Sequence, residues 1–336
     1  MEYINSLQID SLKGVRKISF HNLPAVTLIT GPNGSGKSTV LDAVELLANP
    51  MDPMQYVKLT NNSPKVFYNL FDKKESQPRI RIAGEILEKP YFTELVSHEN
   101  NTDSKFSGYH FFGISKNGKL MNHTNEVSFL FKDFNEKIDS VPLVNVKRIS
   151  EWQNNASLNN IAKDKLVKEK LLSFLSLFDN RFTDIYSPDF HTFYISHEVY
   201  GNLEESFFSD GIRKIIKIAD AMSHFHNGIL LIDDLESHLS PKTLYETVSF
   251  LYALAKEKQI QLFFTTHSQE LIDEWLDMMN FYNELSHLKI IRMKLDGFLS
   301  SFYEFSGKEA YELRLEKELD FRYEYPKKGE TNEGIF

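Results

Sequence analysis

The chain has 336 residues, of which 41% are hydrophobic and 25% are charged, as expected for one large folded domain or a core with an insertion. Its net charge of -9 argues against a strongly basic face for nucleic acid or an anionic membrane, and the lack of cysteine excludes disulfides, zinc–thiolate sites and thiol nucleophiles. With no signal-peptide pattern and no apolar run long enough for a membrane helix, we expect a cytoplasmic protein without a membrane partner.

The first fifty residues predict three short strands and a helix. The strands are expected at residues 4–9, 16–20 and 25–30, with turn residues between them. The third strand runs into a glycine-rich loop at 31–38. A helix is expected after this loop because apolar residues recur at helical spacing, namely Val40, Leu41, Val44, Leu46 and Leu47.

Residues 50–200 are the least regular part of the chain. The prolines between 50 and 64 interrupt regular structure, and the polar run at 93–106 predicts an exposed loop. The remaining signals predict a strand at 79–86, a hairpin turn at Asn117-Gly118, a helix at 163–178 and a strand at 192–196.

The last third alternates between strand and helix patterns. Helices are expected at 211–223 and 242–256 and from 269 and 308 onward, with strands at 229–232, 261–264, 289–293 and 298–305. This alternation predicts a mostly parallel sheet covered by helices. The tail from residue 326 is expected to be disordered.

Residues 31–38 match the phosphate-loop pattern G-x-x-x-x-G-K-[ST] in full, between a strand and a helix. Glycines let the backbone amides face phosphate oxygens, and the helix N-terminus favours an anion. An ordinary glycine-rich turn is the weaker interpretation, because the strand, lysine, serine and helix are all in order. We expect Lys37 to reach the β- and γ-phosphates of ATP. The predicted ATP contacts are Asn33, Gly34, Ser35, Gly36, Lys37, Ser38 and Thr39.

A second motif is the apolar run at 228–232, which ends in Asp233 and Asp234. Carboxylates often follow buried strands, so this pattern alone is weak. Beside a complete phosphate loop, however, a carboxylate at the end of a strand is the expected magnesium ligand. We therefore predict that Ser38 and Asp233 bind Mg²⁺ and that Asp234 polarises the attacking water.

Three further motifs occur in a fixed order around these acids. Ser209-Asp210-Gly211, followed by Arg213, precedes the acidic strand; Leu239-Ser240-Pro241 follows the acids; and Thr265-Thr266-His267-Ser268 ends the next strand. This order resembles that of the ABC ATPases. More narrowly, it resembles the OLD-family, RecF-like and SMC-like branch, whose acidic motif typically reads D-E-x-E-x-x-L-H-P.

The resemblance implies an α/β fold of the ABC type, with a mixed sheet covered by helices and an inserted helical and β lobe. The expected ATPase core comprises residues 1–50 and 200–325. Residues 51–199 are expected to form the inserted lobe, which completes the ATPase domain and recognises a partner, and residues 326–336 to form the disordered tail.

The resemblance also implies a shared nucleotide site. Ser209, Gly211 and Arg213 would contact ATP bound by another copy, so that ATP is sandwiched in a homodimer or a higher homo-oligomer. His267 would contact the γ-phosphate and the attacking water. Taken singly, Ser209-Asp210-Gly211 is explained equally well as a helix cap, and His267 as part of a capped strand end. Their joint order in the sequence favours a role for both in the nucleotide site.

Two details of the site depart from the family pattern. Asp234 stands where the family has glutamate, and its shorter side chain predicts slow hydrolysis unless Glu236 assists. The glutamine that normally links the nucleotide to motion of the partner is not assigned, and Gln77 is only a weak candidate.

The resemblance suggests a stand-alone ATPase, because no D-x-D pair of a TOPRIM nuclease follows His267 and no heptad run is long enough for a coiled-coil arm. PARIS-type and Septu-type anti-phage systems contain ATPases of this kind. We therefore expect an ATPase or sensor subunit of a bacterial defence system that controls a separately encoded nuclease or toxin.

Two alternatives stay open. One is a RecF-like or SMC-like DNA-repair ATPase that acts as an ATP-gated DNA clamp. The basic run of Lys163, Lys165, Lys168 and Lys170 could contact DNA, although such a run is usually a solvated helix face. The other alternative is a nucleotide sensor that does not hydrolyse ATP.

Overall fold

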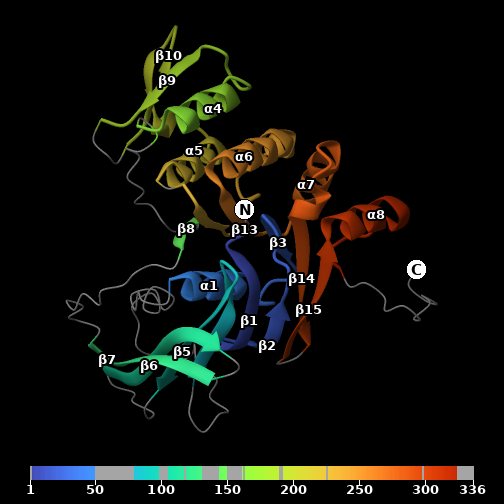
Figure 1. The fold of residues 1–336 in the computed structure, drawn as a ribbon. Helices are drawn as coiled ribbons and strands as arrows, with labels where there is room; N and C mark the ends of the chain where they lie inside the picture. The colour runs from blue at the N-terminus through green and yellow to red at the C-terminus, as the bar shows by residue number, and fades with distance from the viewer. Residues whose placement is uncertain are drawn as a thin grey trace.

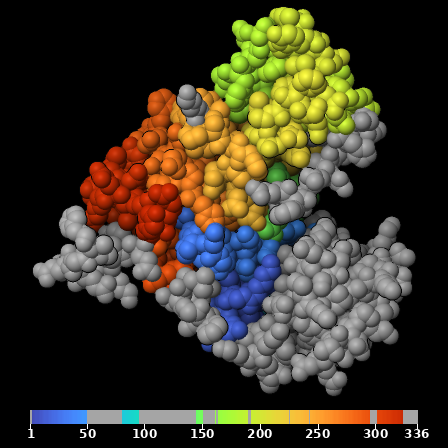
Figure 2. Space-filling model, turned by 180° about the vertical axis from the view of Figure 1, so that it is seen from behind, coloured from blue at the N-terminus to red at the C-terminus, as the bar shows by residue number. Residues whose placement is uncertain are grey.

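The computed structural model describes residues 2–49, 79–97, 105–116, 119–130, 144–149, 161, 163–188, 192–224, 226–296 and 299–323. The expected features at 50–64, Gln77, Asn117-Gly118 and 326–336 lie outside these ranges. The described residues form an α/β structure with three sheets (Figure 1). In Figure 2, the segment of residues 163–208, coloured green to yellow, stands out from the body of the molecule.

The central sheet has six strands in the order β15-β14-β3-β13-β12-β8. Five of them are parallel, and β15 adds an antiparallel edge, which confirms the mixed sheet expected from the sequence. The strands are β3 (Val26–Thr30), β8 (Asn145–Ile149), β12 (Gly228–Ile232), β13 (Ile260–Thr265), β14 (Leu288–Asp296) and β15 (Leu299–Ser306).

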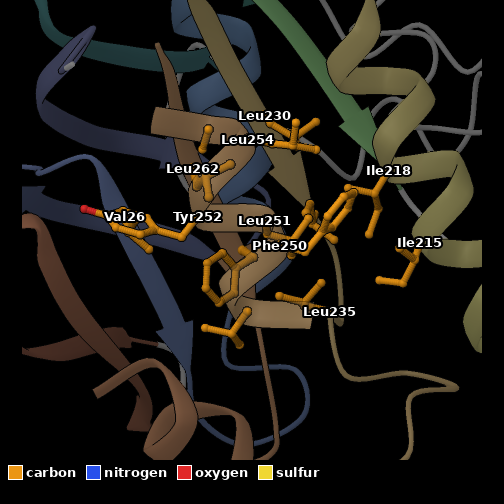
Figure 3. Packing of buried hydrophobic residues seen from close by; sticks show 14 of the residues in the cluster. Val26, Ile215, Ile218, Leu230, Leu235, Phe250, Leu251, Tyr252, Leu254 and Leu262 are labelled. Atoms are coloured by element: carbon orange, nitrogen blue, oxygen red, sulfur yellow. The ribbon is translucent and has the colours of Figure 1, made fainter. Parts of the chain in front are cut away.

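Helices cover both faces of this sheet because its strands are apolar on both sides. Leu230 and Leu262 pack on the face covered by four helices (Figure 3). Ile229 and Phe263 belong to the cluster on the opposite face, which includes the buried residues of α1. The helices are α1 (Lys37–Ala48) on one face and α5 (Asp210–Ser223), α6 (Leu244–Lys258), α7 (Gln269–Phe281) and α8 (Gly307–Lys317) on the other.

A second, antiparallel sheet covers the outer side of α1, so that this helix is buried between two sheets. The packing is close at Gly84, because a Cβ there would lie 2.2 Å from the Ser6 carbonyl oxygen and 2.7 Å from Leu47 Cδ2 on α1. The strand order is β2-β1-β4-β5-β6-β7, with β1 (Ile4–Leu12), β2 (Val15–Phe20), β4 (Arg79–Ile86), β5 (Lys89–Ser97), β6 (Lys105–Lys116) and β7 (Lys119–Leu130).

The prediction of an exposed loop at 93–106 is wrong for the described part of that segment. Residues 93–97 belong to β5, residues 105 and 106 begin β6, and Thr93 is fully buried. A polar sequence can form these strands because an antiparallel sheet needs only one apolar face. The two strands on either side of Asn117-Gly118 do pair, up to Lys116 and Lys119.

A third sheet of three short strands, with α4 (Lys165–Leu175), forms the projecting segment. Asp164 caps α4 by accepting a hydrogen bond from the Val167 amide, and it also pairs at 2.6 Å with the fully buried Lys258 of α6. The segment is thus tied to the core. Its strands are β9 (Phe182–Tyr186), β10 (Tyr194–His197) and β11 (Gly201–Glu204); short 3₁₀ turns lie at Glu205–Phe207, Pro241–Thr243 and Leu285–His287.

The division into a core and an inserted lobe at 51–199 stays a prediction. Strand β8 falls within the expected lobe but pairs in parallel with β12 in the central sheet. Within the described chain, the middle segment therefore contributes directly to the sheet that carries the phosphate loop.

The tight packing around Gly84 generates a stability prediction. Gly84→Ala will lower the free energy of unfolding by about 1–3 kcal/mol, because the added methyl group overlaps the backbone of β1 and the side chain of Leu47. Gly14→Ala is the matched control, because a Cβ at Gly14 meets nothing within 4 Å; it will change stability by less than about 0.5 kcal/mol. Urea unfolding measures both, and equal midpoints would contradict the packing argument.

Candidate active site

The glycine-rich loop lies between the end of β3 and the start of α1, where its backbone is closely packed. Gly31, Gly34 and Gly36 all have positive φ, which favours glycine. A Cβ on Gly31 would lie 2.3 Å from the Met293 carbonyl oxygen, and one on Gly36 would lie 2.5 Å from Val15 Cγ2. The neighbouring strands therefore require glycine at these two positions.

Lys37 is almost fully buried, and its ammonium group is held by its own loop. Nζ donates hydrogen bonds to the carbonyl oxygens of Gly31 and Pro32, each at 3.1 Å. Burial lowers the pKa of Lys37, and the charges of Asp234, Asp233 and Glu236 oppose that shift. The ammonium group of Lys37 therefore lies near three carboxylates, at the point where the loop pattern predicts a bound phosphate.

Ser38 and Asp233 meet although they are 195 residues apart in the sequence. The Ser38 hydroxyl donates to Asp233 Oδ1 at 3.0 Å, and the Thr265 hydroxyl donates to the same oxygen at 2.7 Å. The Asp234 amide in turn donates to Thr265 Oγ1 at 2.9 Å. These residues lie where β3, β12 and β13 end, because parallel strands place their carboxyl ends at one edge of a sheet.

The oxygen donors at this edge fit a magnesium ion. Mg²⁺ prefers hard oxygen ligands, typically one or two side chains together with phosphate oxygens. Burial alone would raise the pKa of Asp233, but the hydrogen bond from Thr265 and the positive charge of Arg148 hold it below its usual value. Asp233 is therefore ionised, as a metal ligand must be.

Arg148 belongs to this site, and sequence reasoning missed it. Its NH2 donates to Asp233 Oδ2 at 3.0 Å, while NH1 pairs with Asp42 and lies 3.6 Å from Glu45. Burial alone would lower the pKa of Arg148, but these carboxylates raise it instead. The available signal was Asp42, an acid on the buried face of the predicted helix, which requires a cationic partner.

Asp234, Glu236 and His267 lie together beyond Asp233. Asp234 Oδ1 is 3.9 Å from His267 Nε2, and both side chains are partly exposed. The His267 amide donates to Glu236 Oε1 at 2.5 Å, so Glu236 holds the backbone of the histidine. Burial raises the pKa of Asp234, and the adjacent negative charges of Asp233 and Glu236 raise it further. Asp234 thus lies beside His267, with Glu236 on the backbone of the histidine, and the role of Asp234 in accepting a proton stays a prediction.

The serine motif begins α5, with Ser209 as the N-cap and a hydrogen bond of 3.5 Å from the Ile212 amide to its hydroxyl. Arg213 pairs with Asp210. Gly211 contacts the loop after the acids, because a Cβ there would lie 2.5 Å from the His238 carbonyl oxygen. In the described part of the chain, no hydrogen bond or ion pair joins Ser209, Gly211 or Arg213 to the phosphate loop.

Lys214, one residue after Arg213, ties α5 to the acidic loop. Its Nζ donates to the carbonyl oxygen of Asp234 at 2.6 Å and to that of Ser237 at 3.3 Å, and it also bonds the Ser237 hydroxyl. Asp234 has a φ of 49°, a left-handed conformation that this aspartate must hold. The lysine therefore braces the loop at the residue expected to act on water.

A family model described as "AAA domain, putative AbiEii toxin, Type IV TA system" matches residues 26–273. Two similar proteins are named Septu protein PtuA. The one from Bacillus mycoides is 28% identical over 92% of this chain, which spans only 42% of that protein. The one from Bacillus thuringiensis is 25% identical, and the match covers 81% of this chain and 73% of that protein.

Solved structures support the fold. An SMC head domain from Thermotoga maritima superposes with a TM-score of 0.53 at 14% identity, covering 90% of this chain and 99% of that one. An SMC head bound to the C-terminal winged-helix domain of ScpA superposes with a TM-score of 0.58 at 13% identity, covering 92% and 99%. Both show an ABC-type ATPase architecture. In the described part of the chain, no helix is both long and apolar enough to cross a membrane.

The bracing role of Lys214 generates a second stability prediction. Lys214→Met will lower the free energy of unfolding by about 1–3 kcal/mol, because the carbonyl groups of the acidic loop lose a charged donor. Lys217→Met, on the same helix but without a described bond to this loop, is the control and will change stability by less than about 0.5 kcal/mol. If both variants unfold at the same urea concentration, the loop is held by its own turns alone.

Proposed function

Because the chain belongs to the AAA domain family whose model matches residues 26–273, we propose that it binds Mg²⁺ and ATP and hydrolyses ATP between two copies of itself. We further propose that it is the ATPase or sensor subunit of an anti-phage system. In this role its nucleotide state would hold or release a separately encoded effector, a nuclease or a toxin.

The observation that carries the ATPase proposal is the junction of Ser38, Asp233 and Thr265, which brings together three distant parts of the sequence at 3.0 and 2.7 Å. The loop amides and Lys37 would hold the phosphates, and Ser38 and Asp233 would hold the metal ion. Bound Mg²⁺ neutralises developing charge on the phosphate oxygens. Asp234 would accept a proton from the attacking water, and His267 would contact the γ-phosphate and that water.

The proposal of a shared site rests on the position of the serine motif. Ser209 begins a 14-residue helix, and such an N-terminus favours an anion. In the described chain, the Ser209 and Arg213 bonds stay within α5, Asp210 lies 4.0 Å from His238 in the loop after the acids, and no printed bond joins the motif to its own phosphate loop. A phosphate held by one copy would therefore meet the motif of a second copy, as in the sandwich dimers that the sequence resembles.

The defence role rests on the two relatives named Septu protein PtuA and on the resemblance to Septu-type pairs. The defence role is supported by analogy, and its test is separate from the tests of ATP binding and hydrolysis. Co-expression of the chain with its neighbouring genes should lower phage plating efficiency, and Lys37→Ala should abolish the protection. Full protection by the Lys37→Ala system would refute control of the effector by nucleotide.

The DNA-clamp alternative receives less support from the described residues. Lys165 pairs with Glu169 at 3.6 Å, Lys168 with Asp184 at 2.5 Å and Lys170 with Glu257 at 2.8 Å. These acids neutralise much of the basic run on α4. DNA binding that depends on ATP and weakens steeply with salt would reverse this order of preference.

A change of mass with nucleotide tests the shared site directly. Light scattering on Asp234→Asn should show a stable dimer or larger form with Mg²⁺ and ATP and a smaller form without nucleotide, because ATP completes the interface and the variant cannot hydrolyse it. Lys37→Ala/Asp234→Asn should stay small under both conditions. A mass that ignores ATP in every variant, although ATP binds, would contradict the sandwich.

The length of the catalytic acid generates a further prediction. Asp234→Glu should raise phosphate release several-fold, because the added methylene moves the carboxylate outward by about 1.5 Å, toward the expected position of water. Turnover is measured with Lys37→Ala as the blank. Lower turnover with unchanged ATP affinity would show that aspartate already fits the site, and no turnover in either protein would favour the non-hydrolysing sensor.

A further inference from the structure

Arg148 joins the magnesium aspartate to a buried anchor. One terminal nitrogen of its guanidinium group lies 3.0 Å from Asp233 Oδ2, and the other pairs with Asp42. The planar fork of an arginine suits two carboxylates at once, because its donors have a fixed geometry. Arg148 lies on β8, beside β12, and is aligned with Leu231, two residues before Asp233.

Asp42 is a firm anchor for this arginine. It lies on α1, four residues after Ser38, and is only 2% exposed. The ammonium group of Lys13, at the end of β1, pairs with its second oxygen at 2.5 Å. Because α1 is packed between two sheets, Asp42 cannot move without the helix that carries the phosphate loop. The salt bridge between Arg148 and Asp42, which lies on this buried helix, therefore fixes the distance between Arg148 and the phosphate loop.

The two oxygens of Asp233 have different partners. Oδ2 is bonded to Arg148, while Oδ1 accepts hydrogen bonds from Ser38 and Thr265. Holding one oxygen limits rotation of the carboxylate about its χ2 torsion, which is otherwise broad. We propose that Arg148 is a positioning residue that orients Asp233 for the metal ion, with Asp42 as its anchor. The inference rests on the proposed Mg²⁺–ATP function and adds a residue to that site.

Charge alone predicts the opposite effect. A positive side chain beside a metal ligand repels the cation, so removing the charge of Arg148 would strengthen metal binding if positioning had no role. Lysine keeps the charge, but a single ammonium group lacks the fork that bridges Asp42 and Asp233. The variants Arg148→Lys and Arg148→Met therefore separate orientation from charge.

The test measures binding of Mn²⁺, a paramagnetic substitute for Mg²⁺, by the electron paramagnetic resonance signal of free Mn²⁺ in the presence of a non-hydrolysable ATP analogue. Both Arg148→Lys and Arg148→Met should weaken Mn²⁺ binding about 10–100-fold, the usual effect of removing a residue that orients a metal ligand. Arg314→Lys is the matched control, because it breaks a similar two-bond pair with Asp273 on α7; it should bind Mn²⁺ like the wild type.

Three outcomes overturn the inference or separate it from the proposed function. If Arg148→Met binds Mn²⁺ more tightly than the wild type, while Arg148→Lys is unchanged, Arg148 acts through charge only and the inference fails. If the wild type binds neither the analogue nor Mn²⁺, the proposed function fails as well. If the wild type and all variants bind equally, only the inference fails.

A second variant covers the case in which Arg148→Met does not fold. Asp42→Asn keeps the shape of the anchor but removes its charge, and it should also weaken Mn²⁺ binding. Both residues act through one chain of contacts. The double variant Asp42→Asn/Arg148→Lys should therefore bind Mn²⁺ no more weakly than whichever of its two single variants binds Mn²⁺ less tightly. Losses that simply multiply would show that Asp42 does not act through Arg148.

Discussion

The candidate site depends on the parallel pairing of β3, β13 and β12. These three strands come from opposite ends of the chain, and their alignment brings the start of α1 to the acids that follow β12. The hydrogen bonds from Ser38 and Thr265 to Asp233 are a consequence of that register. A slip of one residue in any of the strands would exchange the side chains that pack on the two helix-covered faces and would separate Ser38 and Thr265 from Asp233.

Burial on both faces of the sheet makes this register firm. The helices α5 to α8 cover one face, and α1, backed by the antiparallel sheet, covers the other (Figure 1). Two buried charges in these layers are paired: Asp42 with Arg148 and Lys13 at the site, and Lys258 with Asp164, the cap of α4, away from it. Burying these charges costs free energy, and removing one partner would leave the other as an unpaired buried charge. Each member of the network therefore depends on the others.

Local signals explain why much of the fold and site could be predicted from sequence. The glycines, Lys37 and Ser38 form one continuous motif, and an apolar run leads directly to Asp233. Arg148 could not be found in this way, because its strand is short, half polar and at the edge of the sheet, and its two partners are distant in sequence. The strand at residues 93–97 was missed for a similar reason, since Thr93 and Glu94 are buried only through tertiary packing. The roles of Ser209 and Arg213 depend on a second copy and stay predictions.

The contact between Gly211 and the His238 carbonyl group has a consequence for how two copies would communicate. In the proposed sandwich, a shift of one copy's serine motif would press directly on the loop that follows that copy's own acids. Coupling between binding sites is reciprocal. Two nucleotides in a sandwich would therefore be sensed together, so that a partner protein would respond to a fully loaded pair rather than to a single occupied site.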